Sequence, residues 1–261
     1  MIELSRFWRD PALPFIEARR VGDGRKVCYA PHSHESFSIG AITGGRSTYV
    51  TAGACHEVTA GTVVLMNPGV VHTCNPIEGE AWSYVMLFID LPWLQRQGFD
   101  LPQATSSSSP VLYSRLLQVF AALLDAELDP PGKTAVLQEF LRALPGRPSA
   151  SPLLQGPGNP RLMAAAAFIR AHRTDALTLE DICAAAGLSR AYLIRAFRRQ
   201  FGLTPHGYLL DQRVQFARAQ LRRGQSIAEV ALEAGFADQA HLQRAFKQHL
   251  AATPGHYRSA Q

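Results

Sequence analysis

The sequence contains few cysteines, few charged residues and no long apolar run. Its four cysteines, Cys28, Cys55, Cys74 and Cys183, form no C-x-x-C pair, and a chain of 261 residues that is 47% apolar can bury a core without disulfides. We therefore expect a reduced, cytoplasmic environment. The longest apolar stretch, around 82–91, is too short to cross a bilayer, and charged residues within positions 3–10 interrupt any signal-peptide core. The sequence thus predicts neither a membrane segment nor a secretion signal.

The charges that are present are unevenly distributed. Positions 1–158 carry 12 Lys and Arg against 14 Asp and Glu, whereas positions 159–261 carry 14 against 7. A near-neutral first part followed by a basic second part is typical of a sensor joined to a phosphate-binding module. A solvated basic surface would give the same balance, so charge alone leaves both interpretations open.

The basic part contains an internal repeat with an offset of 49 residues. The run 193–198 (LIRAFR) returns at 242–247 (LQRAFK), and 204–208 (TPHGY) returns at 253–257 (TPGHY). A duplicated helical unit with a cationic face suits a periodic polyanion, and DNA has a repeat that rigid spacing can match. The repeat therefore predicts a DNA-binding protein.

Each copy is predicted to be a helix-turn-helix. In the first copy a helix capped by Thr178 ends at Gly187, and in the second Ser226 caps the first helix and Gly235 makes the turn. A long helix over 205–223 connects the copies and could hold them about one DNA turn, ~34 Å, apart. A generic helical hairpin would explain one copy, but not two with aligned cationic faces.

The second helix of each copy should bury one face and expose the other. We expect Leu193 and Phe197 to face the core in the first copy, as Leu242 and Phe246 do in the second. The opposite faces carry Arg and Gln side chains, which pair in the major groove with guanine and adenine respectively. The two helices are therefore expected to read different bases.

These residues belong to a longer pattern. The basic part contains AAGLS at 185–189, FGLTP at 201–205 and TP-x2-YR at 253–258, and it resembles the DNA-binding domain of the AraC/XylS family of bacterial transcription regulators. Two positions depart from the family pattern, since Ala251 stands where the family usually has glycine and His241 where an aromatic residue is common.

The resemblance implies two helix-turn-helix subdomains whose second helices enter successive major grooves. By position it implies base contacts from Arg190, Ala191, Ile194 and Arg195 in the first copy, and from Asp238, Gln239, Gln243 and Arg244 in the second. Phosphate contacts, which set register and salt dependence, are expected from Arg198, Arg199 and Lys247.

The first part of the sequence is predicted to be rich in β-structure. Between positions 15 and 90, short runs of β-branched and aromatic residues alternate with glycine-rich turns, as in an antiparallel barrel or sandwich. We expect strands over 36–43, 47–51, 62–66 and 82–89, with a turn at Gly44-Gly45. Amphipathic helices are expected over 111–128 and 134–144. Their apolar stripes would pack on the barrel or form a seam between two subunits.

Three histidines form a candidate metal site. His32 and His34 would face the same side of a strand, and His72 would arrive from a later one. Three imidazoles suit Zn, Ni, Cu or Fe and leave positions open for a further ligand. The arrangement resembles the cupin fold, of the arabinose-binding type found ahead of AraC-like modules. Because the acid that metal-binding cupins carry shortly after the second histidine is absent, a structural role without metal remains an alternative.

Further side chains in this part are candidates for an effector pocket, or simply for core: Phe37, Tyr49, Trp82, Tyr84 and Met86. Cys74 lies two residues beyond His72 and would face the same side of a continuing strand, as a thiolate ligand, a redox sensor or a buried small hydrophobe.

The expected fold class is α+β with several domains. A cupin-like β-barrel for effector sensing would span 1–104, a helical dimerisation or packing segment 105–145, a Pro-, Gly- and Ser-rich linker 146–158, and an all-α DNA-binding domain 159–261. The two helix-turn-helix motifs of the last domain are expected over about 178–201 and 226–250.

The predicted function is that of a cytoplasmic transcription regulator, not an enzyme, controlled by a small molecule or metal in the barrel and requiring no cofactor. Its expected partners are promoter half-sites in double-stranded DNA, a small-molecule effector, RNA polymerase and a second copy of the chain. One alternative is a metal-dependent cupin oxygenase or isomerase fused to a DNA-binding tail. Another is a constitutive DNA-binding protein whose barrel only dimerises.

Overall fold

The computed structural model describes residues 5–51, 53–144 and 158–259. Their contacts divide them into an N-terminal unit, 5–28 with 34–144, and a helical unit, 158–259 with Tyr29–Ser33. We call Tyr29–Ser33 the anchor segment, because it packs with helices that lie far from it in sequence. The predicted α+β class is confirmed. Among the described residues, no helix is both long and apolar enough to cross a membrane. The predicted linker over 146–158 lies almost wholly outside the described residues.

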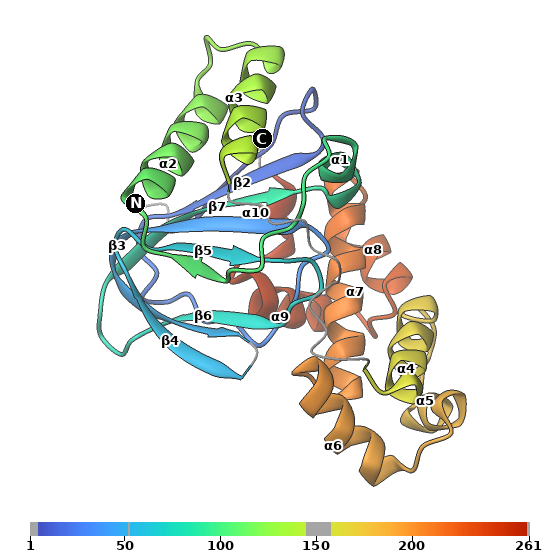
Figure 1. Cartoon of the computed structure of the whole chain (residues 1–261). Coiled ribbons are helices and arrows are strands. Elements are labelled where there is room, and N and C mark those ends of the chain that lie inside the picture. The colour runs from blue at the N-terminus through green and yellow to red at the C-terminus, as the bar shows by residue number, and fades with distance from the viewer. Residues whose placement is uncertain (1–4, 52, 145–157, 260–261) are drawn as a thin grey trace. The chain divides into compact units, whose positions relative to one another are not determined.

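The N-terminal unit is built on antiparallel strands (Figure 1). These are β1 (Arg6–Trp8), β2 (Ile16–Val21), β3 (Phe37–Thr51), β4 (Ala54–Thr59), β5 (Val63–Met66), β6 (His72–Pro76), β7 (Trp82–Ile89) and β8 (Ser106–Ser107). The strand order is β1-β2-β7-β3-β5-β8, and β4 and β6 also pair with β3. The strand predicted over 82–89 is confirmed as β7.

Strand β3 connects the two halves of this sheet. Its first part pairs with β7 and β5, and its second part, from Arg46 to Thr51, pairs with β4 and β6. The turn predicted at Gly44-Gly45 is therefore wrong. A register shift between Ile42 and Gly44 absorbs the irregularity, so the two glycines stay paired with β7 and one strand replaces the two expected.

Helices α1 (Leu91–Arg96), α2 (Pro110–Leu124) and α3 (Pro130–Ala143) complete the N-terminal unit. Helix α3 begins four residues earlier than predicted. Asp129 caps it by accepting a hydrogen bond from the amide of Gly132, and the proline at the first helical position needs no amide partner there.

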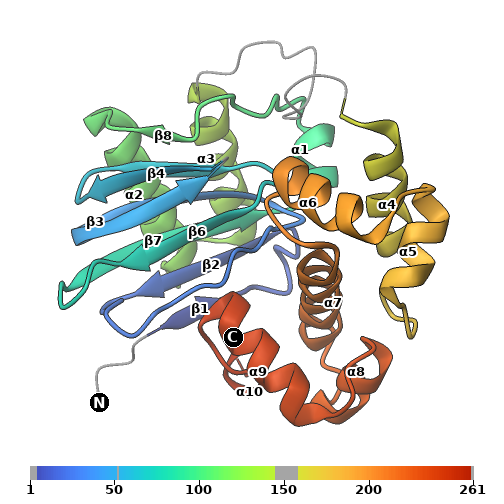
Figure 2. The same ribbon diagram turned by 90° about the horizontal axis from the view of Figure 1, so that it is seen from below.

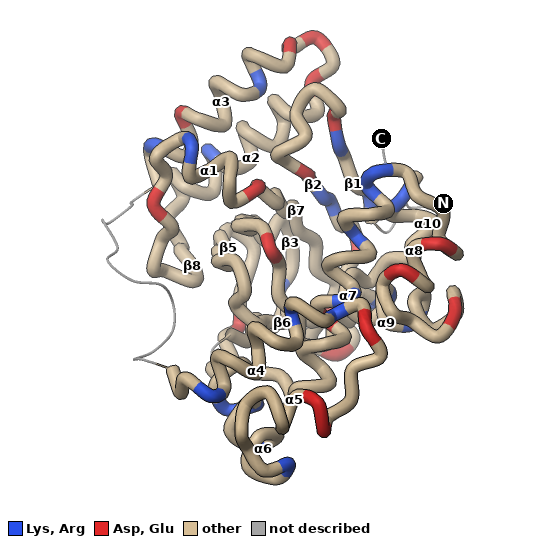
Figure 3. Tube along the Cα trace, turned by 90° about the vertical axis from the view of Figure 1, so that its right-hand side faces the viewer, with Lys and Arg blue, Asp and Glu red and all other residues tan. Residues whose placement is uncertain are grey.

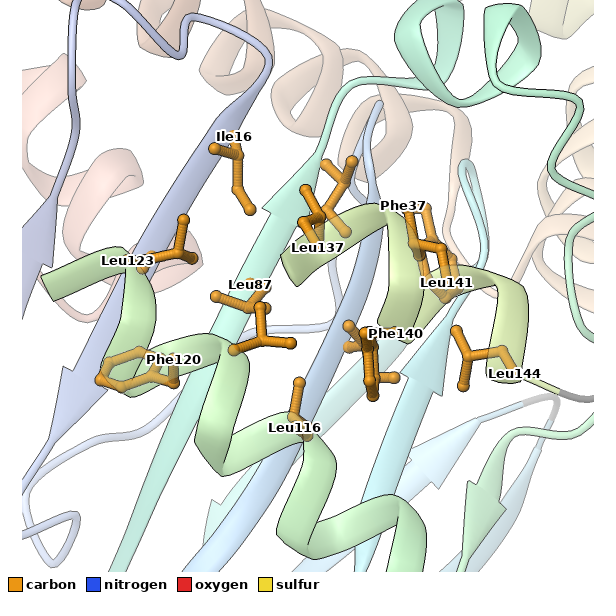
Figure 4. Close-up of a cluster of buried hydrophobic side chains, with 14 of the residues drawn as sticks. Ile16, Phe37, Leu87, Leu116, Phe120, Leu123, Leu137, Phe140, Leu141 and Leu144 are labelled. Carbon is orange, nitrogen blue, oxygen red and sulfur yellow. The ribbon is translucent and has the colours of Figure 1, made fainter. Parts of the chain in front are cut away.

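The apolar stripes of α2 and α3 pack on the sheet (Figure 4). Leu116 and Leu137 are fully buried in one cluster with Ile16, Phe37 and Leu87 from the strands. These stripes are therefore not free to form a seam between subunits. The apolar side chains left exposed on α2 are those of Val111 (63%) and Leu124 (41%).

The helical unit contains α4 (Pro160–Ala171), α5 (Leu179–Ala186), α6 (Arg190–Phe201), α7 (Pro205–Arg222), α8 (Ile227–Glu233), α9 (Gln239–Leu250) and α10 (Pro254–Arg258). Figure 2 shows α7 end-on, with α4, α5 and α6 on one side and α8, α9 and α10 on the other. This 18-residue helix is the predicted connection, and at 1.5 Å per residue it is about 27 Å long.

The 49-residue repeat has a structural basis in both copies. The threonine of each TP-x2-Y run caps the helix that follows it. Thr204 caps α7 by accepting from the amide of Gly207, and Thr253 caps α10 by accepting from the amide of His256. The tyrosine then packs on the phenylalanine of the preceding helix. Ring centroids lie 5.4 Å apart for Phe197 and Tyr208 in the first copy, and the second copy repeats this contact at 5.3 Å. The repeated residues thus hold the second helices in place.

Candidate functional site

The first helix-turn-helix consists of α5 and α6. Thr178 and Asp181 form a reciprocal capping box at the start of α5, and Gly187 ends it with a φ of 62°. Leu193 and Phe197 of α6 are fully buried. These features agree with the sequence prediction, and they fix which face of α6 remains exposed.

The exposed face of α6 holds all of the predicted contact residues of the first copy: Arg190, Ala191, Ile194, Arg195, Arg198 and Arg199. Arg190 forms an ion pair with Glu180 of α5 at 2.9 Å, and both side chains are about two-thirds exposed. Such a solvated pair contributes little to stability, so Arg190 can leave Glu180 for another partner at small cost.

The second helix-turn-helix consists of α8 and α9. Ser226 and Glu229 form the capping box of α8, and Leu242 and Phe246 of α9 are fully buried. Asp238 caps α9, because its carboxylate accepts a hydrogen bond from the amide of His241 at 2.6 Å. The sequence analysis missed this role.

The exposed side chains of the second copy include Asp238, Gln239, Gln243, Arg244 and Lys247. The cap uses Oδ1 of Asp238, so only Oδ2 would remain to contact a base. His241, which replaces the aromatic residue common in the family, packs edge-on against Phe236 with ring centroids 5.1 Å apart. Figure 3 shows the Lys and Arg positions along the chain, including those on the helical unit.

Arg213 of α7 fixes the turn of the second copy. Its guanidinium donates to the carbonyl oxygens of Arg173 (2.8 Å) and Asp175 (2.7 Å), in the loop between α4 and α5. Gly235 lies against the same loop, because a Cβ there would come within 2.8 Å of the Thr174 carbonyl oxygen. The turn of the second copy is thereby packed against the loop that leads into the first copy.

The three predicted histidines are buried and close together. Their candidate ligand nitrogens all lie within 4.8 Å of one another, so the group could hold a metal ion. Rings of His34 and His72 have centroids 4.8 Å apart. His72 is on β6, but the expectation that His32 and His34 share a strand is wrong, since β3 begins only at Phe37. An extended segment ahead of β3 brings them together instead.

Backbone carbonyl oxygens orient two of the histidine rings. Nδ1 of His32 lies 2.8 Å from the carbonyl oxygen of Ala30, and Nδ1 of His72 lies 2.9 Å from that of Val70. A carbonyl oxygen only accepts, so Nδ1 carries a proton in both rings and Nε2 is the nitrogen that could bind a metal. Burial lowers the pKa of His72 to about 4. The donor set therefore fits a divalent metal, and a backbone carbonyl behind each ring is the usual second partner of a metal-binding histidine.

No acidic side chain joins this group among the described residues. Glu35 follows His34 and is exposed, as expected from its position. Cys74 lies on β6 with its sulfur 3.6 Å from the Ser47 hydroxyl oxygen, and burial raises the pKa of its thiol to about 11. These surroundings favour the neutral thiol of this partly buried cysteine over the reactive thiolate.

The predicted pocket residues fall on two faces of the sheet. Phe37 belongs to the core beneath α2 and α3. Trp82 and Tyr84 stack on each other, with centroids 4.8 Å apart, and lie outside that cluster. Tyr49 is fully buried and donates its hydroxyl to the Leu65 carbonyl oxygen at 3.2 Å. Phe37 must therefore be removed from the candidate pocket, because it faces the helices.

The chain carries two helix-turn-helix pairs with exposed cationic second helices, together with an antiparallel sheet unit. This combination defines a helix-turn-helix DNA-binding regulator. A family model described as a helix-turn-helix domain matches residues 182–260, and one described as an AraC-like ligand binding domain matches residues 16–156. The chain belongs to the AraC family of helix-turn-helix transcription regulators. This family consists of regulators rather than enzymes, so the cupin-enzyme alternative is not supported.

Relatives match over most of the chain. The uncharacterized HTH-type transcriptional regulator YbfI of Bacillus subtilis is 26% identical over 245 residues, covering 89% of this chain and 87% of YbfI. The transcriptional activator RhaS of Escherichia coli is 25% identical over 240 residues, covering 87% and 86%. Among solved structures, an apo variant of ToxT from Vibrio cholerae superposes with a TM-score of 0.57 at 13% identity, covering 94% of this chain and 97% of ToxT. That likeness shows the fold.

Proposed function

We propose that this regulator binds two adjacent DNA half-sites with α6 and α9, under the control of a ligand held by residues of the AraC-like ligand-binding region, 16–156. The observation that supports the proposal best is that all eleven predicted contact residues are exposed, while their hydrophobic neighbours on α6 and α9 are buried. In the proposed complex Arg195 and Arg244 contact guanine edges and Gln243 an adenine edge. Arg198, Arg199 and Lys247 contact phosphates.

Selection from a random DNA library with the full chain tests this assignment. We expect Arg195→Ala and Arg244→Ala each to weaken the selected site roughly 5- to 150-fold and to relax selection at one base position. Arg142→Ala, an exposed arginine near the end of α3, is the matched control and should change neither quantity. Failure to enrich any sequence would refute the proposal, as would both variants selecting the same site with unchanged affinity.

We propose further that His32, His34 and His72 hold a divalent metal such as Zn, Ni or Fe. A bound metal would supply a positive centre with positions open for an effector's oxygen or nitrogen atoms. The chain's own contribution is to hold the imidazoles in place. Burial favours the neutral form of His72, and the carbonyl oxygens behind His32 and His72 orient those two rings.

Zinc titration of the chelator-stripped protein, in competition with a chromophoric chelator, tests the metal. One equivalent per chain is expected, with affinity reduced at least tenfold in His34→Ala and His72→Ala. His56→Ala, an exposed histidine on β4, is the control and should bind as the wild type does. If zinc is not taken up, or if uptake survives both triad substitutions, the histidines have a structural role.

An organic effector is proposed to contact Tyr49, Trp82 and Tyr84. Trp82 is 2% exposed, and its indole nitrogen has no acceptor among the described residues, so an oxygen of a bound molecule would satisfy it. A ToxT structure is described as bound to an unsaturated fatty acid, which makes fatty acids one class to include in a thermal-shift screen. The constitutive alternative expects no shift with any compound or metal.

A further inference from the structure

The helical unit holds the anchor segment through several hydrogen bonds. Asp211 of α7 accepts from both the amide (3.1 Å) and the hydroxyl (2.6 Å) of Ser33. One turn further along the same helix, Gln215 donates to the Ser33 carbonyl oxygen at 2.6 Å. All three polar groups of Ser33 are thus bonded to α7.

The other end of the anchor segment contacts the second recognition helix. The amide of Ala30 donates to the carbonyl oxygen of Gln248 in α9 at 2.8 Å. The ring of His32 meets that of His249 edge-on, with centroids 6.4 Å apart. The anchor segment therefore bridges α7, which connects the two helix-turn-helix pairs, and α9, which carries the predicted contacts of the second copy.

Burial of Asp211 makes the loss of this contact costly. Its side chain is completely buried, and burial is the main cause that raises its pKa above the usual range. A buried carboxylate is costly unless it is hydrogen-bonded. Losing both bonds to Ser33 would leave Asp211 with the side-chain bonds from Gln212 (3.5 Å) and Gln215, and water or a rearrangement would have to replace the rest. We call the arrangement with the anchor segment in place the closed state; an open state would be one in which these bonds are lost and α7 is hydrated.

We propose that the anchor segment is a regulatory contact whose closed and open states bind DNA with different affinity. The proposal rests on the proposed function, because Ser33 stands directly between His32 and His34 in the chain. A ligand that moves either imidazole displaces Ser33 through adjoining peptide bonds, so ligand binding and the Ser33–Asp211 contact are not independent. The closed state is defined by named hydrogen bonds, so their opening can be measured.

Reciprocity supplies a test that needs no knowledge of the ligand. If the anchor segment changes DNA affinity, DNA must change the opening of the anchor segment by the same factor. We expect hydrogen exchange at the amides of Ala30 and Ser33, in the full chain, to change at least fivefold when the selected DNA is added. Exchange that stays within twofold in the DNA complex overturns the proposal, whether or not zinc binds. A chain that binds no DNA overturns both this inference and the proposed function.

Ser33→Ala and Ser36→Ala form a matched pair of variants. Ser33→Ala removes the hydroxyl bond to Asp211, whereas the Ser36 hydroxyl oxygen lies 3.5 Å from that of Ser38 within the N-terminal unit. Ser33→Ala should shift the dissociation constant for DNA at least fivefold and alter the exchange response, and Ser36→Ala should shift it less than twofold. A purely structural contact would lower the melting temperature of Ser33→Ala with DNA affinity and exchange response unchanged, and that result would also overturn the proposal.

Discussion

Ala251 ends α9 with a φ of 49°, in the left-handed conformation that Gly202 adopts at the equivalent end of α6 with a φ of 76°. Ala251 is the sole non-glycine residue with positive φ in the described part of the chain. An L-residue with a Cβ is strained there by about 1 kcal/mol. We therefore expect Ala251→Gly to raise the free energy of unfolding by about 1 kcal/mol, measured by urea denaturation of the full chain.

The converse substitution is the control for this effect. Gly202→Ala places the same strain at the end of α6 and should lower the free energy of unfolding by a similar amount. If Ala251→Gly leaves the free energy of unfolding unchanged while Gly202→Ala lowers it, then the positive φ of Ala251 is not a source of strain.

The two turn glycines should differ in their tolerance of alanine. Gly187 and Gly235 both have positive φ, but a Cβ at Gly187 meets nothing within 4 Å, whereas at Gly235 it would lie 2.8 Å from the Thr174 carbonyl oxygen. Gly187→Ala should cost about 1 kcal/mol, and Gly235→Ala should cost more because a backbone atom must move. Equal losses in denaturation would show that the loop before α5 yields easily.

Phosphate and base contacts should separate by salt dependence. Lys247→Ala is expected to weaken all DNA sequences about equally and to lower the slope of log affinity against log salt by about 1. Arg244→Ala should instead discriminate among sequences. Fluorescence anisotropy with the selected site and a scrambled site, at several salt concentrations, measures both effects. The assignment of Lys247 fails if its loss alters sequence preference and leaves the salt slope unchanged.

The stability of the chain should fall in mild acid because His72 is buried. Its pKa is lowered to about 4 in the folded state from an ordinary value of 6.5, so below pH 6.5 the unfolded state binds the proton more readily. The loss accumulates as the pH falls from 6.5 toward 4 and reaches about 3 kcal/mol. Denaturation of the metal-free protein at a series of pH values should show this decline, and His72→Gln should flatten it. A decline unaffected by that substitution would assign it to other groups.

The cysteines should react in two classes. Cys28 and Cys55 are exposed, whereas burial raises the pKa of Cys74 to about 11. Because the thiolate is the nucleophile, iodoacetamide at pH 8 should label Cys28 and Cys55 in the folded protein and Cys74 only after unfolding. Peptide mass spectrometry measures the extent of labelling. Rapid labelling of Cys74 in the folded chain would revive the redox-sensor interpretation.

The repeat made the helical unit predictable from sequence. Caps at Thr178 and Ser226, the turn at Gly187 and the buried pair Leu193 and Phe197 are local signals, and each determines its own neighbourhood. The second helices and their exposed faces follow from these signals by helical periodicity alone. The predicted element bounds are therefore accurate to within a few residues here.

The sheet unit was less predictable, because its errors depend on partners distant in sequence. Gly44-Gly45 has the composition of a turn, but pairing with β7 keeps it in a strand. Phe37 alternates correctly along β3, yet only the position of α2 and α3 decides that it faces helices and not a pocket. The Ser33–Asp211 contact joins residues 178 apart, and no local pattern marks a serine in a loop or an acid within a helix as partners.

The packing of Tyr29–Ser33 with the helical unit affects how domains of this family can be exchanged between members. A chimaera that exchanges sensor halves at the interdomain junction imports a foreign pentapeptide into the helical body, where Asp211 and Gln215 require a serine of the right reach. The ligand response of such a chimaera should therefore depend on whether donor and recipient carry matching residues at positions 33, 211 and 215. This holds even when every residue near the DNA and every residue near the ligand has been kept.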